Sequence, residues 1–122
     1  MYISPFKLEF YRVEKGYKQY LLKKPMYIIG EGFEDICIPT NFKTDLTSIP
    51  RPLNKIIKRN NPKYARAALV HDFLYSRESE NSSRLFADNM FWRCMKYEEV
   101  PLRYMIPFYV SVRIFGFFRY KR

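Results

Sequence analysis

The sequence predicts an α+β fold, in which a small N-terminal antiparallel β-sheet is followed by three or four helices. Before residue 40 the apolar residues alternate with polar ones, whereas after residue 50 they recur at the three-to-four-residue spacing of a helix. Strands followed by helices are typical of this class. At 122 residues the chain can build one modest core, so we expect a single domain over residues 1–122, β-rich over about 6–39 and helical over about 51–122.

The expected strands lie between turn and proline signals. Residues 6–13 (FKLEFYRV) place apolar side chains on one face, and Gly16 turns the chain into residues 18–24 (KQYLLKK). Two further apolar runs follow at residues 26–30 (MYIIG) and 35–39 (DICIP). Because short turns connect antiparallel neighbours, these runs predict an antiparallel sheet.

The expected helices begin at proline or serine residues. Pro62 marks the start of a helix that continues to about Tyr75, since proline is favoured in a first helical turn. Ser82 or Ser83 can cap the next helix, and a last helix begins after Pro101. A short basic turn or helix is expected over residues 52–59.

The last helix is too short to cross a membrane. Its apolar run, residues 104–118, has 15 residues, whereas a span needs roughly 20. We therefore expect a buried helix and no transmembrane segment. An interfacial helix anchored by the basic sequence RYKR is the alternative.

The charge of the chain indicates an acidic partner. Twenty-two basic and 12 acidic residues give a net charge of +10, which favours nucleic acid, anionic lipid, an anionic substrate or an acidic protein surface. No nucleic-acid-binding motif accompanies this charge, so a solvated basic surface is the simpler interpretation. The basic residues form two groups, Arg51, Lys55, Lys58, Arg59, Lys63 and Arg66, and then Arg113, Arg119, Lys121 and Arg122.

The cysteines exclude a zinc knuckle. Cys37 and Cys94 lie far apart and the chain has a single histidine, so four zinc ligands of the usual kinds and spacing are not available. We expect both thiols to be reduced. The N-terminus lacks the basic and apolar regions of a signal peptide.

Asp72 and Asp88 occupy positions that helical periodicity assigns to the core. His71, the only histidine, lies beside Asp72, and Arg84 lies one helical turn before Asp88. A buried carboxylate without partners costs several kcal/mol, so we expect both acids to be paired, protonated or metal-bound. The two apolar stripes are Ala65, Ala68, Leu69, Asp72 and Tyr75, and then Leu85, Asp88, Trp92 and Met95.

Three motifs follow one another along the chain. Their residues are Ile38, Pro39, Phe42, Thr44, Asp45, Ser48 and Pro50, then Ala67, Ala68, His71, Asp72, Leu74 and Tyr75, then Ala87 and Asp88. In this order the motifs resemble the phage and prophage family catalogued as domain of unknown function 1353. The resemblance covers roughly residues 26–120 and includes Gly116 in the closing helix. Asn41 stands where the family usually has glycine, and asparagine tolerates a left-handed conformation. The resemblance implies a phage or prophage origin, hence the host cytoplasm or the phage virion, but no activity.

The candidate site gathers Asp45, His71, Asp72 and Asp88. Carboxylates with one imidazole suit Mg²⁺, Mn²⁺ or Zn²⁺, and a metal-activated water would make the protein a small hydrolase with His71 or an acid as proton carrier. Metal-dependent HD phosphohydrolases need further histidines, which this chain lacks. The supporting residues are Tyr75 at the rim, and Thr44, Ser48 and Arg84.

A purely structural role for the same residues is the alternative. Asp45 can cap its own turn, and Asp88 can pair with Arg84. Two functions therefore remain open: a phage hydrolase acting on an anionic substrate, or a non-enzymatic phage protein, virion-associated or host-factor-binding, that uses basic and aromatic surface. A cleft open to solvent at the acids favours the hydrolase, whereas acids sealed under Trp92 favour the binding protein.

Overall fold

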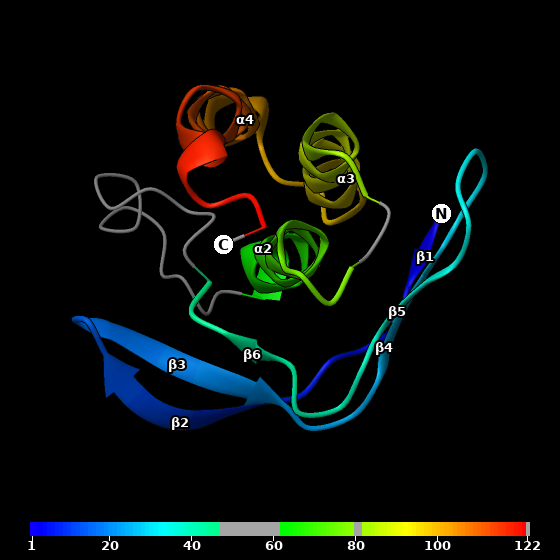
Figure 1. Ribbon diagram of the computed structural model, residues 1–122. Coiled ribbons are helices and arrows are strands. Elements are labelled where there is room, and N and C mark those ends of the chain that lie inside the picture. Colours follow the sequence, from blue (N-terminus) through cyan, green and yellow to red (C-terminus); the bar gives the residue numbers. More distant parts are fainter. Residues whose placement is uncertain (47–61, 80–81, 122) are drawn as a thin grey trace. The chain divides into compact units, whose positions relative to one another are not determined.

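The computed structural model describes residues 1–46, 62–79 and 82–121, and the chain divides into two compact units, Met1–Asp45 and Leu46–Arg122 (Figure 1). The first unit contains strands and the second contains helices. This order of elements confirms the predicted α+β class. The expected turn or helix over residues 52–59 lies outside the described residues.

Residues 1–46, all of which the structure describes, form two three-stranded antiparallel sheets with strand orders β1-β4-β5 and β2-β3-β6. The expected single sheet is therefore two sheets. Two of the strands, β1 and β6, have only two residues, which is too short to produce an alternating pattern. The bounds are β1 Tyr2–Ile3, β2 Leu8–Glu14, β3 Tyr17–Leu22, β4 Met26–Ile29, β5 Ile36–Ile38 and β6 Lys43–Thr44.

Two turns of this unit depend on residues that accept a left-handed backbone. Lys15 and Gly16 have φ values of 53° and 79°, the two positive values that a two-residue β2–β3 hairpin requires. Asn41 has φ 71°, and its backbone N–H donates to the Leu22 carbonyl at 2.6 Å. The conformation expected for asparagine at this position is confirmed.

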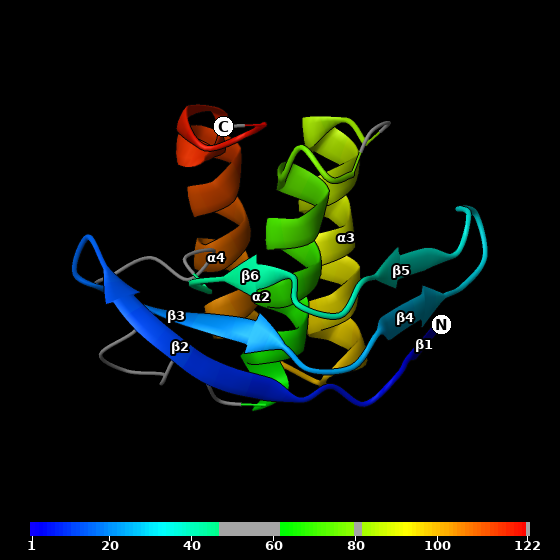
Figure 2. The same ribbon diagram turned by 60° about the horizontal axis from the view of Figure 1, so that its bottom comes forward.

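In the part of the chain that the structure describes, the second unit holds three α-helices side by side and one short 3-10 helix (Figure 2). The bounds are α2 Pro62–Tyr75, α3 Arg84–Tyr97, α4 Leu102–Phe115 and η1 Gly116–Phe118. Ser83 caps α3, because its Oγ accepts from the Phe86 N–H at 3.0 Å. The predicted helix starts at Pro62, Ser83 and after Pro101 are confirmed. No helix among these residues is long and apolar enough to span a membrane.

The buried face of α3 differs from the predicted stripe. Leu85 is 53% exposed and Trp92 is half-buried, so neither belongs to the core. Asp88, by contrast, is buried as expected. The buried residues of this helix are Ala87, Asp88, Met90, Phe91, Cys94 and Met95.

Helix α2 is buried on almost every side, so a single apolar stripe does not describe it. His71 is buried, whereas the Asp72 side chain keeps 9% of its surface exposed. The histidine, and not the adjacent acid, therefore takes the core position. Helix α2 contacts α3 extensively, and three alanines, Ala65, Ala67 and Ala68, keep much of its buried surface small.

The two cysteines are free thiols in different surroundings. Cys37 is exposed on β5, whereas Cys94 is buried in α3. Burial, together with the charge of Glu98, raises the pKa of the Cys94 thiol to about 12. Cys94 therefore behaves as a small apolar core residue.

Candidate functional site: a buried aspartate network

The site is built by three helices of the second unit. Helix α2 supplies His71 and Tyr75, which lie one helical turn apart and so share a face. Helix α3 supplies Arg84 and Asp88 at the same spacing, and α4 supplies Arg113. Asp88 is the residue that these side chains surround.

Both oxygens of the Asp88 carboxylate accept hydrogen bonds. Oδ1 lies 2.7 Å from His71 Nε2 and accepts from the Tyr75 hydroxyl at 2.7 Å. Oδ2 accepts from Arg113 Nη1 at 2.8 Å, and Arg84 Nε lies 4.0 Å away. The side chain of Asp88 is 0% exposed. These contacts satisfy a carboxylate that burial would otherwise destabilise by several kcal/mol.

The contacts also determine which atoms carry protons. Burial raises the pKa of Asp88, but the hydrogen bonds from His71, Tyr75 and Arg113 outweigh burial and hold it below its usual value. The carboxylate is therefore ionised at neutral pH and can only accept, so His71 Nε2 carries a proton. Burial, and then the hydrogen bond to Asp88, raises the pKa of Tyr75, which keeps its hydroxyl protonated.

Aromatic rings enclose the network. The imidazole of His71 lies 4.1 Å from the Tyr75 ring and 4.9 Å from the Phe91 ring, measured between centroids. Tyr75 also meets Tyr120 edge-on at 5.4 Å. These rings separate the polar groups from water, which strengthens the hydrogen bonds inside.

Gly116 lets the chain pass directly beside the Tyr75 hydroxyl. A Cβ atom at this position would collide with that hydroxyl and press against the Tyr75 ring. The first residue of η1 must therefore lack a side chain for Tyr75 to reach Asp88.

Arg84 links α3 to the end of α4. Its Nη2 donates to the Val112 carbonyl at 3.1 Å and to the Arg113 carbonyl. These carbonyls belong to the last turn of α4, where the Val112 carbonyl also accepts from the Gly116 N–H. The arginine therefore caps α4 while its Nε faces Asp88.

Of the predicted site residues, the structure brings together His71, Tyr75, Arg84 and Asp88. Asp72 faces elsewhere and lies 3.9 Å from Arg119 Nη2. Asp45 and Thr44 belong to the first unit, where Thr44 is buried in β6 and Asp45 is half-buried. Ser48, and the turn that Asp45 was expected to cap, lie outside the described residues.

Sequence reasoning missed the role of Arg113. It was assigned to a basic group near the end of the chain, although it lies between Val112 and Ile114 in an apolar helix. A charge in such a run is the same signal that identified Asp88, and it predicts a buried partner of opposite sign. Gly116 was noted as a family match, but its contact with Tyr75 was not foreseen.

The donor set of the network does not fit a metal ion. A divalent cation at Asp88 would stand beside the Arg113 guanidinium, which already neutralises the carboxylate. Across the described ranges, no group of three or more His, Cys, Asp or Glu could hold a metal ion. A site that also includes Asp45 and Asp72 stays a prediction.

Three residues of the second basic group, Arg113, Arg119 and Lys121, have partners within the chain. Lys121 Nζ donates to the carbonyls of Leu74 at 3.3 Å, Ser76 at 2.9 Å and Ser79, and burial lowers the pKa of Lys121. Arg113 pairs with Asp88, and Arg119 lies near Asp72. These three basic residues therefore contribute to the internal structure of the helical unit.

These features define an α+β protein whose helical unit encloses an ionised aspartate. Residues 20–112 match the family described as "Protein of unknown function (DUF1353)", and the chain belongs to this family. The match includes His71, Tyr75, Arg84 and Asp88, and Arg113 follows it directly. No curated protein and no solved structure matches the chain.

Proposed function

We propose that the protein is a non-enzymatic binding protein, and specifically a phage accessory protein that docks a host factor or a virion assembly. The observation that carries this proposal is the complete burial of Asp88. A buried aspartate can act in catalysis only through a histidine that reaches the substrate, whereas here His71 is buried as well and both Asp88 oxygens are hydrogen-bonded.

In this proposal the network maintains the shape of the helical unit. Asp88 connects α3 to α2 through His71 and Tyr75, and to α4 through Arg113. A buried carboxylate with both oxygens hydrogen-bonded favours one packing of three helices over alternatives, because any shift leaves a buried charge unpaired. The helices can then present a fixed surface to a partner.

An activity screen tests the proposal. Purified protein and His71→Gln are assayed on phosphoesters, nucleotides and peptidoglycan fragments, with Mg²⁺, Mn²⁺ or Zn²⁺ and with a chelator. We expect no turnover under any condition. Turnover by the wild type that His71→Gln abolishes would contradict the proposal and establish the predicted hydrolase.

A further inference from the structure

Helix α4 exposes a row of four aliphatic side chains. Leu102, Ile106, Val110 and Ile114 follow one another at a spacing of four residues and are 45–61% exposed. Over these twelve residues the helix rises about 18 Å at about 1.5 Å per residue. A contiguous apolar row on an exposed helix is unusual unless it binds something.

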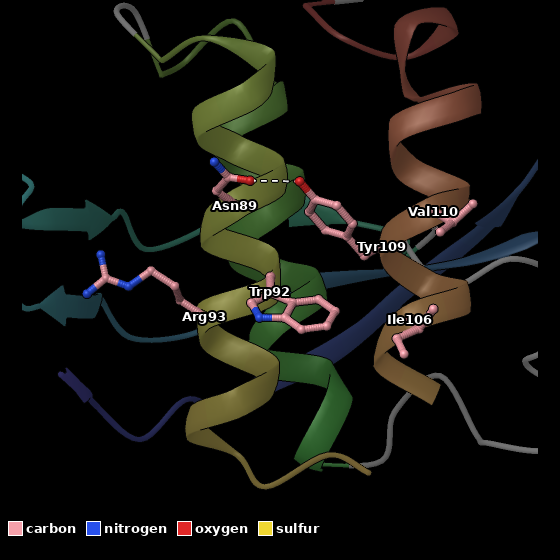
Figure 3. A pocket seen from close by; sticks show the side chains of 6 residues that line it. All are labelled: Asn89, Trp92, Arg93, Ile106, Tyr109 and Val110. Atoms are coloured by element: carbon pink, nitrogen blue, oxygen red, sulfur yellow. Dashed lines mark hydrogen bonds between the residues drawn. The ribbon is translucent and has the colours of Figure 1, made fainter. Parts of the chain in front are cut away.

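A groove lies beside this row, between α3 and α4 (Figure 3). Its volume is about 500 Å³, and its lining is mostly apolar: Asn89, Trp92, Arg93, Ile106, Tyr109 and Val110.

Two contacts between the helices shape the groove. Tyr109 donates to Asn89 Oδ1 at 2.8 Å, and the Trp92 ring meets the Tyr109 ring edge-on at 5.5 Å. The groove is therefore formed before any partner arrives.

The surroundings of the groove are positively charged. From Pro101 to Lys121 the chain contains no aspartate or glutamate, and the one acid of α3, Asp88, is buried. Arg93 lines the groove, Lys96 lies one turn after Trp92, and Arg103 lies three residues before Ile106. Lys96 and Arg103 are exposed.

We propose that this groove binds an amphipathic helix of an acidic partner protein. Apolar side chains at helical spacing would pack against Trp92, Ile106 and Val110, and carboxylates on the flanks of the same helix would face Arg93 and Arg103. Grooves between two helices commonly bind a third helix in this way. The inference rests on the proposed binding function and adds the chemistry of the partner.

Two other occupants fit the surface less well. A second copy of the chain would bring a net charge of +10 and the same basic rim, which repel the first copy. A lipid bilayer would contact the protruding aliphatic row of α4, but it would leave the hollow that Trp92 and Tyr109 line between two helices unfilled.

A peptide selection tests the inference. A displayed library with apolar residues fixed at i, i+3, i+4 and i+7, and all other positions random, is selected on the wild type and counter-selected on Ile106→Glu. We expect the enriched peptides to carry Asp and Glu beside the apolar face. Peptides enriched without acidic residues, or no peptide that distinguishes the two proteins, would overturn the inference.

Trp92, the only tryptophan, reports binding directly. Binding of an enriched peptide that lacks tryptophan should shift the fluorescence emission of Trp92 to shorter wavelength. The same peptide with Glu and Asp replaced by Lys should cause no shift. Ile106→Glu should weaken the peptide at least tenfold. The matched control, Val13→Glu, alters an equally exposed residue of the first unit and should leave the Kd unchanged. Val110→Ser replaces Ile106→Glu if thermal melts show that the latter is unfolded.

The other occupants give distinct results. A Trp92 shift on phosphatidylserine vesicles with none on the acidic peptide would overturn the inference in favour of a membrane. A dimer in sedimentation that Ile106→Glu dissociates would overturn it in favour of self-association.

The failures of the two proposals are separable. A photo-crosslinking residue at position 110 is introduced in cells that carry the source genome, and the captured segment is mapped by mass spectrometry. A partner captured through a segment that is not an acidic helix leaves the binding function intact and overturns only the inference. Turnover that depends on His71 overturns the binding function itself.

Discussion

At the scale of single residues, Asp88 is the residue whose loss we expect to destabilise the fold most, because its charge is buried. Removing this carboxylate leaves the Arg113 guanidinium, His71 Nε2 and the Tyr75 hydroxyl without their acceptor. Asp72 is different, since it keeps 9% of its side-chain surface exposed and lies 3.9 Å from Arg119, whose side chain is 44% exposed. Water partly screens such a pair.

We therefore expect Asp88→Ala to lower the free energy of unfolding by about 3–5 kcal/mol, the usual cost of breaking a buried pair. Asp72→Ala should cost less, about 1–3 kcal/mol, because its side chain is largely buried but its Arg119 partner is partly screened by water. Urea denaturation of both variants measures the difference. Equal losses would show that burial of Asp88 has no special role.

The lowered pKa of Asp88 makes a prediction about acid. A carboxyl group whose pKa is lower in the folded state stabilises the fold fully above its unfolded pKa of about 3.9, and loses this contribution as the pH falls towards the folded value. The stability difference between wild type and Asp88→Asn should therefore shrink as the pH falls below about 4. A difference that does not change down to pH 2 would contradict the assignment.

At the scale of elements, the contact between α2 and the start of η1 is sterically fixed. Gly116→Ala places a methyl group against the Tyr75 hydroxyl, and we expect a loss of about 1–3 kcal/mol, as for other overpacked sites. Tyr75→Phe removes that hydroxyl along with its bond to Asp88. In the Tyr75→Phe background, Gly116→Ala should therefore lower the free energy of unfolding by less than it does in the wild type.

A double-mutant cycle measures this coupling by urea denaturation. Additive losses, with no coupling energy between positions 75 and 116, would show that the two residues do not meet in solution.

The helix limits could be predicted because their signals are local. Pro62, Ser83 and Pro101 act on the backbone beside them, and their effect does not depend on the rest of the fold. The core face of α3 could not be predicted as reliably. An apolar residue at a helical spacing, such as Leu85, satisfies the pattern whether or not another element covers it.

The site could be predicted only in part, because some of its contacts depend on the packing of helices that are far apart in sequence. Asp88 stood out because a charge lay in an apolar run, and Arg84 was one turn away. Arg113 lies 25 residues from Asp88 in sequence, and only the packing of α4 brings them together. His71 was expected in one site with both Asp72 and Asp88; it bonds to Asp88, whereas Asp72, the next residue of the helix, points about 100° away.

At the scale of the whole molecule, the basic residues behind the net charge of +10 differ in their surroundings. Arg113, Arg119 and Lys121 lie against acceptors of the same chain, so the charge near the end of the chain is partly structural. Arg93 lines the α3–α4 groove instead, and Lys96 and Arg103 are exposed residues of the same two helices. If the groove binds a partner as proposed, stability and binding depend on different basic residues, and variants can separate them.

The central claim is that His71 and Asp88 maintain the fold and do not perform catalysis. The free energy of unfolding of His71→Ala, measured by urea denaturation, tests this claim most directly. We predict a loss of about 2–4 kcal/mol, because the substitution opens a cavity and removes a donor from a buried carboxylate. Catalytic residues are often held at a cost to stability. A variant as stable as the wild type, or more stable, would contradict the claim.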